Sequence, residues 1–167
     1  MKKKYENSVR EIINEYNIKP KKKLGQNFLH DKNIISSIVI KADVEDEDII
    51  EIGPGPAILT ESILKNKARS LLVIEKDNSF EINLKKIKNN YKDNFDYLIN
   101  DVIDFDFKTL TKKDYKFVSN LPYNISVPFI LKMIKIRKII PWKEMILMVQ
   151  KEVAERITAD IGTKNYG

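Results

Sequence analysis

The sequence contains no cysteine and only one histidine, His30, and these shortages exclude several kinds of site. Without cysteine there is no disulfide, no thiolate zinc site and no cysteine nucleophile. A single histidine cannot build a multi-histidine metal centre and gives little support to a histidine-based triad, so we expect no metal site. No apolar run approaches the roughly 20 residues of a membrane-spanning helix, and residues 1–6 show no apolar signal core. We therefore expect a cytoplasmic protein that has no membrane partner.

The positive charge of the chain is concentrated at one end. The 167 residues are 43% hydrophobic and 32% charged, which is typical of a globular domain with a sizeable core. Residues 1–23 hold eight Lys or Arg and three Glu, a net +5, which leaves only +1 of the overall +6 for residues 24–167. We expect residues 1–23 to form a basic arm that contacts a phosphate backbone without choosing a sequence. A solvated lysine-rich tail explains the charge equally well.

Apolar periodicity predicts two helices before the main part of the chain. The arm carries the stripe of a short amphipathic helix at Val9, Ile12, Ile13 and Tyr16. Asp31 is expected to cap a second helix, whose apolar face would consist of Ile34, Ile35, Ile38 and Val39.

From residue 48 onward, predicted strands alternate with predicted helices. The strands are expected at 48–52, 70–74, 95–100, 116–119 and 145–149, and the helices at 57–67, at 79–88, from 126, where Ser126 would cap, and from about 151. This alternation predicts a Rossmann-like α/β fold, with a mostly parallel central sheet and helices on both faces. Ligands of such sheets bind at the carboxyl ends of the strands, so we expect the functional residues there.

The loop after the first strand, residues 53–57, favours a ligand that lacks phosphates. Gly53 and Gly55 allow a tight turn and a close approach of the backbone to a ligand. A dinucleotide fingerprint needs a further small residue where Ile58 stands, and Pro54 and Pro56 remove two backbone donors that a pyrophosphate would use. A plain strand-to-helix turn remains an alternative for this loop.

Carboxylates follow the next two strands at positions that suit a nucleoside. Glu75 lies about 20 residues after the glycine loop, where a carboxylate can accept the hydroxyl hydrogens of a ribose. Asp101 can accept from an adenine amino group, while the backbone at Val102 reads the edge of the ring. A surface glutamate and a solvated acidic loop are the alternatives. A nucleoside pocket without phosphate donors suits S-adenosylmethionine, which we expect as the cofactor.

The fourth strand ends in the most specific motif of the chain, Asn120-Leu121-Pro122-Tyr123. An aromatic amine is a poor nucleophile because its lone pair is delocalised into the ring. The Asn120 side-chain carbonyl and a backbone carbonyl near Leu121 can accept the two amino hydrogens, which favours the tetrahedral nitrogen that attacks. Pro122 holds the turn extended, and Tyr123 offers a face on which a purine can stack. An ordinary turn is the alternative, but the position after a nucleoside pocket favours methylation of an amino group.

Several motifs together resemble a known family, the adenine N6,N6-dimethyltransferases of small-subunit ribosomal RNA, in their bacterial form. The resemblance covers all but the basic arm. It is carried by residues 23–31 (Lys-Leu-Gly-Gln-Asn-Phe-Leu-His-Asp), 51–55, 73–75, Asp101, 120–126 (Asn-Leu-Pro-Tyr-Asn-Ile-Ser), 150–156 and 164–167.

The resemblance implies a class I S-adenosylmethionine-dependent methyltransferase. It implies that Gln26, Asn27 and Leu29 lie over the cofactor, with Gly53 and Gly55 beside its methionine part. Glu75 would hold the ribose, Asp101 and Val102 the adenine, and Asn120 would lie near the methyl group. Asn120 and Tyr123 would meet the target, which in the family is a pair of neighbouring adenosines in a hairpin near the 3′ end of small-subunit RNA. Each receives two methyl groups while the subunit is partly assembled, and we expect a monomeric enzyme.

Two departures from the family pattern stand out. Family chains continue beyond the Tyr-Gly of residues 166–167 into a small helical domain that helps to seat the RNA. We therefore expect residues 24–167 to be the catalytic domain of a longer protein. Pro56 is stiffer than the residue expected in the glycine loop. The lysines at 85, 86, 88, 132, 135 and 138 are expected on solvated faces.

The residues alone leave other functions open. A resistance-type methylase of large-subunit RNA, or a DNA adenine methylase, would share the pocket and differ in the nucleic acid it modifies. A non-catalytic RNA- or DNA-binding factor built on the same fold would be expected to have an eroded pocket, yet Glu75, Asp101 and Asn120 are all present. A dinucleotide oxidoreductase is disfavoured by the proline-rich loop and by the lack of a credible hydride-site acid.

Overall fold

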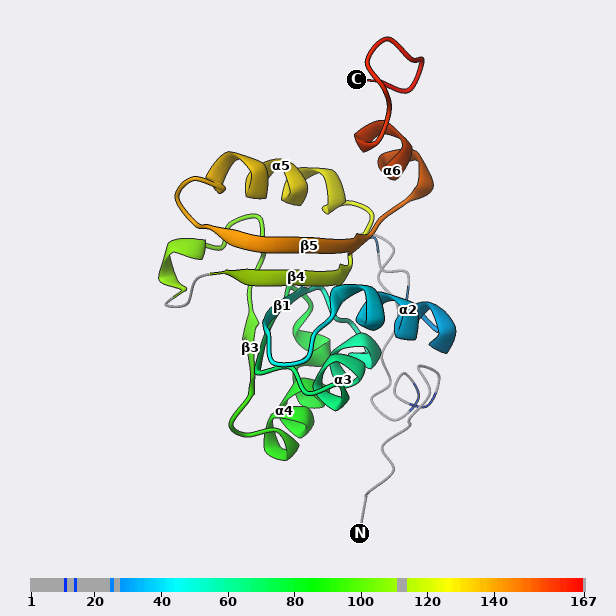
Figure 1. Ribbon diagram of the computed structural model, residues 1–167. Helices are drawn as coiled ribbons and strands as arrows, with labels where there is room; N and C mark the ends of the chain where they lie inside the picture. Colours follow the sequence, from blue (N-terminus) through cyan, green and yellow to red (C-terminus); the bar gives the residue numbers. More distant parts are fainter. Residues whose placement is uncertain (1–10, 12–13, 15–24, 26–27, 111–113, 167) are drawn as a thin grey trace.

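The computed structural model describes residues 11, 14, 25, 28–110 and 114–166 (Figure 1). The predicted basic arm and its short helix lie almost entirely outside these residues. Gln26 and Asn27, two of the residues expected over the cofactor, also lie outside them.

The centre of the protein is a five-stranded sheet in which every pair of neighbours is parallel. The strand order is β3-β2-β1-β4-β5, which confirms the predicted α/β fold. The strands are β1 (Asp48–Ile52), β2 (Ser70–Glu75), β3 (Phe95–Ile99), β4 (Tyr115–Asn120) and β5 (Trp142–Met148). Since β1 and β4 are neighbours, the order reverses between them, and this is where open parallel sheets bind ligands.

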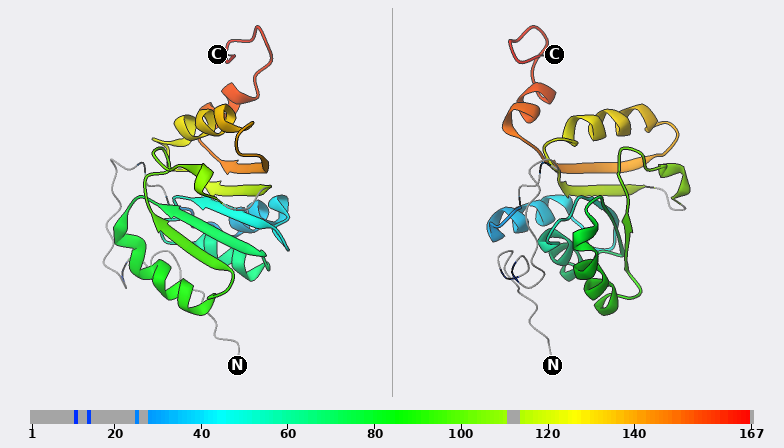
Figure 2. Two further views of the ribbon diagram at one scale, coloured as in Figure 1. Left: turned by 90° about the vertical axis from the view of Figure 1, so that its left-hand side faces the viewer. Right: turned by 180° about the vertical axis from the view of Figure 1, so that it is seen from behind.

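Helices cover both faces of the sheet, as predicted (Figures 1 and 2). One face packs against the three helices α2, α3 and α4, and the other packs against α5 and a short 3-10 helix, η3. Helix α6 buries none of its residues and projects from the end of β5. The bounds are α2 (Lys32–Ala42), α3 (Ile58–Lys65), η2 (Asn78–Phe80), α4 (Glu81–Asn90), η3 (Phe107–Thr109), α5 (Ser126–Ile136) and α6 (Lys151–Ile157).

Alternation along the strands divides the core into two clusters. In β1, Ile49 joins the cluster on the α2–α4 face, while Ile50 and Ile52 join the cluster on the α5 face. The second cluster contains packed aromatic rings: the Phe117 ring centroid lies 5.8 Å from that of Phe129 in α5 and 5.9 Å from that of Phe107. Helix α5 is therefore attached to the sheet through aromatic contacts.

Helix α2 begins as predicted and buries a slightly different face. The Asp31 carboxylate accepts hydrogen bonds from the backbone N–H groups of Asn33 and Ile34, so Asp31 is its N-cap. Ile35, Ile38 and Val39 are buried, but Ile34 is 42% exposed, and the expectation for Ile34 was wrong. The helix instead buries Ala42, which lies one turn beyond Ile38.

Three further local expectations are corrected by the structure. Ser126 does not cap α5; it is the first residue of that helix, and its hydroxyl donates to the carbonyl of Tyr123. Strand β5 begins at Trp142 rather than at residue 145, because the pairing with β4 extends back to Tyr115. Lys132 does not lie on a solvated face, since its amine donates to backbone carbonyls.

Truncating the ring that joins α5 to the sheet tests this account of the core. We expect Phe129→Ala to lower the free energy of unfolding by about 3–5 kcal/mol, because Phe129 is fully buried and its ring contacts other rings on the sheet. Val127→Ala, on the same helix but 45% exposed, should cost less than about 1 kcal/mol. Urea unfolding followed by far-UV circular dichroism measures both, and equal losses would contradict the account.

Candidate active site

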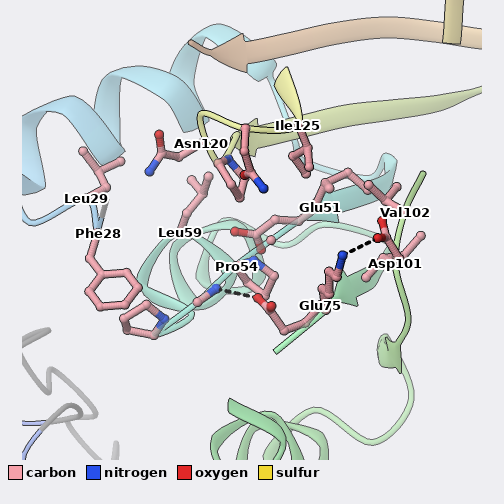
Figure 3. Close-up of a pocket in the computed structure, with 18 of the residues that line it drawn as sticks. Phe28, Leu29, Glu51, Pro54, Leu59, Glu75, Asp101, Val102, Asn120 and Ile125 are labelled. Atoms are coloured by element: carbon pink, nitrogen blue, oxygen red, sulfur yellow. Dashed lines mark hydrogen bonds and ion pairs between the residues drawn. The ribbon is translucent and has the colours of Figure 1, made fainter. Parts of the chain in front are cut away.

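A pocket opens at the carboxyl ends of β1, β2 and β4, where the strand order reverses (Figure 3). It encloses about 850 Å³ of space, part of which is open solvent. Leu29, Gly53, Gly55, Glu75, Asp101, Val102, Asn120 and Pro122, all predicted site residues, line it together. The structure thus brings residues from five separate segments into one cavity.

The glycines after β1 make room for protein side chains. Gly53 has a φ of +61°, and a Cβ there would lie 2.9 Å from Cγ of Pro122. Gly55 has a φ of +55°, and a Cβ there would lie 3.2 Å from the ring of Phe28. Both positions combine a left-handed backbone with a close neighbour, which favours glycine. The glycine loop is therefore packed between the segment after β4 and the segment before α2.

The segment before α2 also contacts the segment after β4. The carbonyl of Gly25 accepts a hydrogen bond from the backbone N–H of Tyr123, with an N···O distance of 3.4 Å. Gly25 has a φ of +63°, and a Cβ there would lie 2.6 Å from Oδ1 of Asn124. Any side chain at residue 25 would push these two segments apart.

Glu75 lies in the pocket with its carboxylate held by the backbone. One oxygen accepts from the N–H of Gly55 at 3.1 Å (Figure 3), and the other accepts from the N–H of Asp77 at 2.7 Å. Burial raises the pKa of Glu75, and these backbone donors oppose the rise. Each carboxylate oxygen has two lone pairs, so both can still accept from ligand hydroxyls.

Asp101 is held from two sides at the far end of the pocket. Its Oδ2 accepts from the Lys76 amine at 2.5 Å, and its Oδ1 accepts from the N–H of Ile103 at 2.9 Å. The hydrogen bond from Lys76 is the main reason that the pKa of Asp101 lies below its usual value. The carboxylate is therefore ionised at neutral pH and serves as an acceptor.

Glu51 is a pocket residue that was not among the predicted site residues. It is buried in β1, and its Oε2 accepts from the Thr60 hydroxyl at 2.6 Å. Burial raises the pKa of Glu51 to about 8, so the carboxyl is mostly neutral at pH 7. The signal for this residue was an acidic side chain inside a strand, between the apolar residues Ile50 and Ile52.

The motif after β4 separates into residues that face the pocket and residues that do not. Asn120 and Pro122 line the cavity. The Leu121 side chain is buried in the core against α5, so only its backbone can serve the site. Tyr123 is 43% exposed and does not line the cavity, so it lies outside it. The end of β4 is fixed to β1, because the Ser119 hydroxyl accepts from the N–H of Ile52 at 2.8 Å.

The walls of the pocket are apolar at one end and acidic at the other (Figure 3). Phe28, Leu29 and Leu59 lie on one side, while Glu75, Asp101 and Val102 lie on the opposite side. Three carboxyl groups and one amine, that of Lys76, are among the lining residues. Such a lining suits a neutral or cationic ligand better than a diphosphate. Phe28 and Leu59 were not predicted, because their position depends on how distant segments pack.

In the described part of the chain, the His, Asp and Glu side chains form no group of three or more that could hold a metal ion. None of the helices in these described residues is both long and apolar enough to cross a membrane.

Comparison with known proteins gives a consistent result. A family model described as ribosomal RNA adenine dimethylase matches residues 17–167. The ribosomal RNA small subunit methyltransferase A of Anaplasma marginale is 43% identical over 146 residues, which cover 87% of this chain and 53% of that protein. The protein of the same name from Leuconostoc mesenteroides is 39% identical over 163 residues, covering 93% of this chain and 54% of its own.

A solved structure agrees with the sequence comparisons. The crystal structure of a dimethyladenosine transferase from Plasmodium falciparum superposes with a TM-score of 0.70 at 31% identity, covering 84% of this chain and 50% of that one. The chain spans about half the length of the curated relatives that it matches.

The buried carboxyl of Glu51 predicts a pH dependence of stability. Between the ordinary glutamate pKa of 4.5 and the pKa of about 8 in the folded chain, the folded chain keeps a proton that the unfolded chain has released. Its free energy of unfolding therefore falls as the pH rises through this range, with a slope from this group of up to roughly 1.4 kcal/mol per pH unit. Glu51→Gln should flatten that slope and stabilise the chain more at pH 8 than at pH 5.

Urea unfolding at half-unit steps from pH 5 to pH 9 measures this effect. Glu155→Gln, at an exposed position on α6, is the matched control and should leave the slope close to that of the unmodified chain. An unchanged slope in Glu51→Gln would contradict a neutral buried Glu51.

Proposed function

The chain belongs to the ribosomal RNA adenine dimethylase family, and we propose that it methylates N6 of two adjacent adenosines in small-subunit ribosomal RNA. The methyl groups come from S-adenosylmethionine, and the adenosines lie in a hairpin near the 3′ end of the RNA. One observation carries the proposal: a pocket lined by three carboxyl groups, with its one lysine amine paired to Asp101, meets the Asn120–Tyr123 segment at a single edge of the sheet. The names of the relatives support the choice of small-subunit RNA.

The lining of the pocket fits S-adenosylmethionine. Glu75 is oriented to accept ribose hydroxyls, because backbone donors already fix its carboxylate. Asp101 offers a charged acceptor to an adenine amino group, beside the buried side chain of Val102. The carboxyl of Glu51 lies between this end and Asn120 (Figure 3). The acidic lining favours a cation, and the cofactor supplies a methyl group made electrophilic by a positively charged sulfur.

Transfer requires that the protein position the target amine and accept its hydrogens. The Asn120 side-chain carbonyl and the carbonyl of Leu121 are the proposed acceptors, and they favour a nitrogen whose lone pair points at the methyl group. Pro122 fixes this segment, because it is packed against Gly53. No strong general base is required, since an alkylated amine is acidic enough to lose its proton to solvent.

The target base must leave its stack to reach Asn120, which costs a few kcal/mol. Exposed Tyr123, beside the pocket, offers its ring as a stacking surface for that base. The positive charge of residues 1–23 is proposed to contact the phosphate backbone. Residues 24–167 form the proposed catalytic domain, which acts as a monomer on a partly assembled subunit.

Identification of the labelled nucleoside tests the reaction. The chain is incubated with radiolabelled S-adenosylmethionine and small subunits whose adenosines lack N6 methylation, and the RNA is then digested to nucleosides. We expect label in N6-methyladenosine and N6,N6-dimethyladenosine. Label in large-subunit RNA or DNA, with none in small-subunit RNA, would contradict the proposal that small-subunit RNA is the substrate. A chain that binds S-adenosylhomocysteine but labels none of these nucleic acids would contradict catalysis by residues 1–167.

Replacement of Asn120 separates catalysis from cofactor binding. Asn120→Ala should lower the methyl-transfer rate by about 100-fold or more, because an acceptor needed in the transition state is lost. The Kd for S-adenosylhomocysteine should change by less than about threefold, since Glu75 and Asp101 still hold the nucleoside. Single-turnover kinetics and isothermal titration calorimetry measure the two quantities. A parallel loss of both would contradict the role assigned to Asn120.

A further inference from the structure

Lys132 of α5 is a lysine whose amine is occupied by backbone carbonyls. Its Nζ donates to the carbonyl oxygens of Ile103 at 2.6 Å, Phe105 at 2.7 Å and Val102 at 3.2 Å. It also lies 5.3 Å from the centroid of the Phe107 ring. An ammonium group has three hydrogens, and three carbonyls surround this one. The amine thus serves as a fixed centre around which the chain after β3 is wrapped.

The segment that Lys132 holds is the wall of the pocket at its proposed adenine end. Asp101 and Val102 line the cavity, and Asp101 begins a tight turn in which its carbonyl accepts from the N–H groups of Asp104 and Phe105. The Asp101 carboxylate accepts from the N–H of Ile103. Residues of this one turn therefore both line the pocket and bind the Lys132 amine.

Charge explains why a lysine is stable at this position. Partial burial lowers the pKa of Lys132, and the nearby carboxylates of Asp104, Asp106 and Asp101 oppose that effect. Lys76, the other amine at this end, pairs with the Asp101 side chain. The ammonium of Lys132 is thus matched by three carboxylates and three carbonyl dipoles.

Helix α5 connects this wall to the other half of the site. The helix starts at Ser126, directly after the segment that holds Asn120 and Pro122, and Phe129 and Met133 anchor it in the core. The turn at residues 101–105 lies outside any helix or strand and is joined to α5 through Lys132. A rigid helix therefore sets the distance between the adenine end and the Asn120 end.

We propose that Lys132 is a positioning residue that fixes the adenine-reading turn, residues 101–105, against α5 and thereby sets the preference of the pocket for adenine. The inference rests on the proposed function, because it takes the pocket to be the site of the cofactor. Lys132 does not touch the base. Without its amine the three carbonyls lose their shared donor, and the acceptor on Asp101 and the backbone at Val102 lose their fixed spacing.

The test compares two ligands on the same protein sample. Isothermal titration calorimetry gives the Kd of S-adenosylhomocysteine and of S-inosylhomocysteine, in which an oxygen replaces the adenine amino group. The unmodified chain should prefer the adenine compound. Lys132→Met should raise the Kd of the adenine compound by about tenfold and the Kd of the inosine compound by less than about threefold. The preference for the adenine compound would therefore shrink. Because the preference is a ratio within one sample, a general loss of stability leaves it unchanged.

Control variants complete the test. Lys135→Met, at an exposed position on the same helix, should leave both affinities and the preference unchanged. Lys132→Gln keeps a donor for one carbonyl and should reduce the preference for the adenine compound less than Lys132→Met does. If Lys132→Met does not fold, Lys132→Gln replaces it in the test. A preference that is intact in folded Lys132 variants would overturn the inference and leave the proposed function standing. An unmodified chain that binds neither ligand would instead overturn the proposed function.

Discussion

The close approach of the ends of β1 and β4 is the constraint on which the rest of the site depends. The N–H of Ile52 donates to the buried hydroxyl of Ser119, and one residue later Gly53 turns with a positive φ against Pro122. A side chain at residue 53 would meet the proline ring. This contact sets the glycine loop and Asn120 side by side at the point where the strand order reverses. The proposed donor and acceptor of the methyl group therefore meet because of backbone packing.

The electrostatics of the pocket follow from the same arrangement. Parallel strands bring their carboxyl ends to one edge, so Glu51, Glu75 and Asp101 collect in one cavity although they are distant in sequence. Their environments differ: burial keeps Glu51 mostly neutral at pH 7, backbone donors hold the carboxylate of Glu75, and Lys76 lowers the pKa of Asp101. Prolines in the loop remove donors that a diphosphate would need. The pocket therefore suits a cationic ligand better than a diphosphate.

Much of this arrangement could be predicted from the sequence, because its signals are local. The strand ends at Glu75, Asp101 and Asn120 follow apolar runs, and a parallel sheet brings such ends together. The remaining features depend on tertiary contacts. Lys132 looks like any surface lysine of a helix until the turn after β3 folds back onto its amine. Glu51 gains its raised pKa only when folding buries its carboxyl group.

The most direct test of the central claim is a crystal structure of the chain with S-adenosylhomocysteine. The account predicts the ligand in the pocket at the reversal of strand order, with its ribose hydroxyls on Glu75 and its adenine between Asp101 and Val102. The sulfur would lie toward Asn120. A ligand bound elsewhere on the surface, or bound in the pocket with its ribose away from Glu75, would contradict the account.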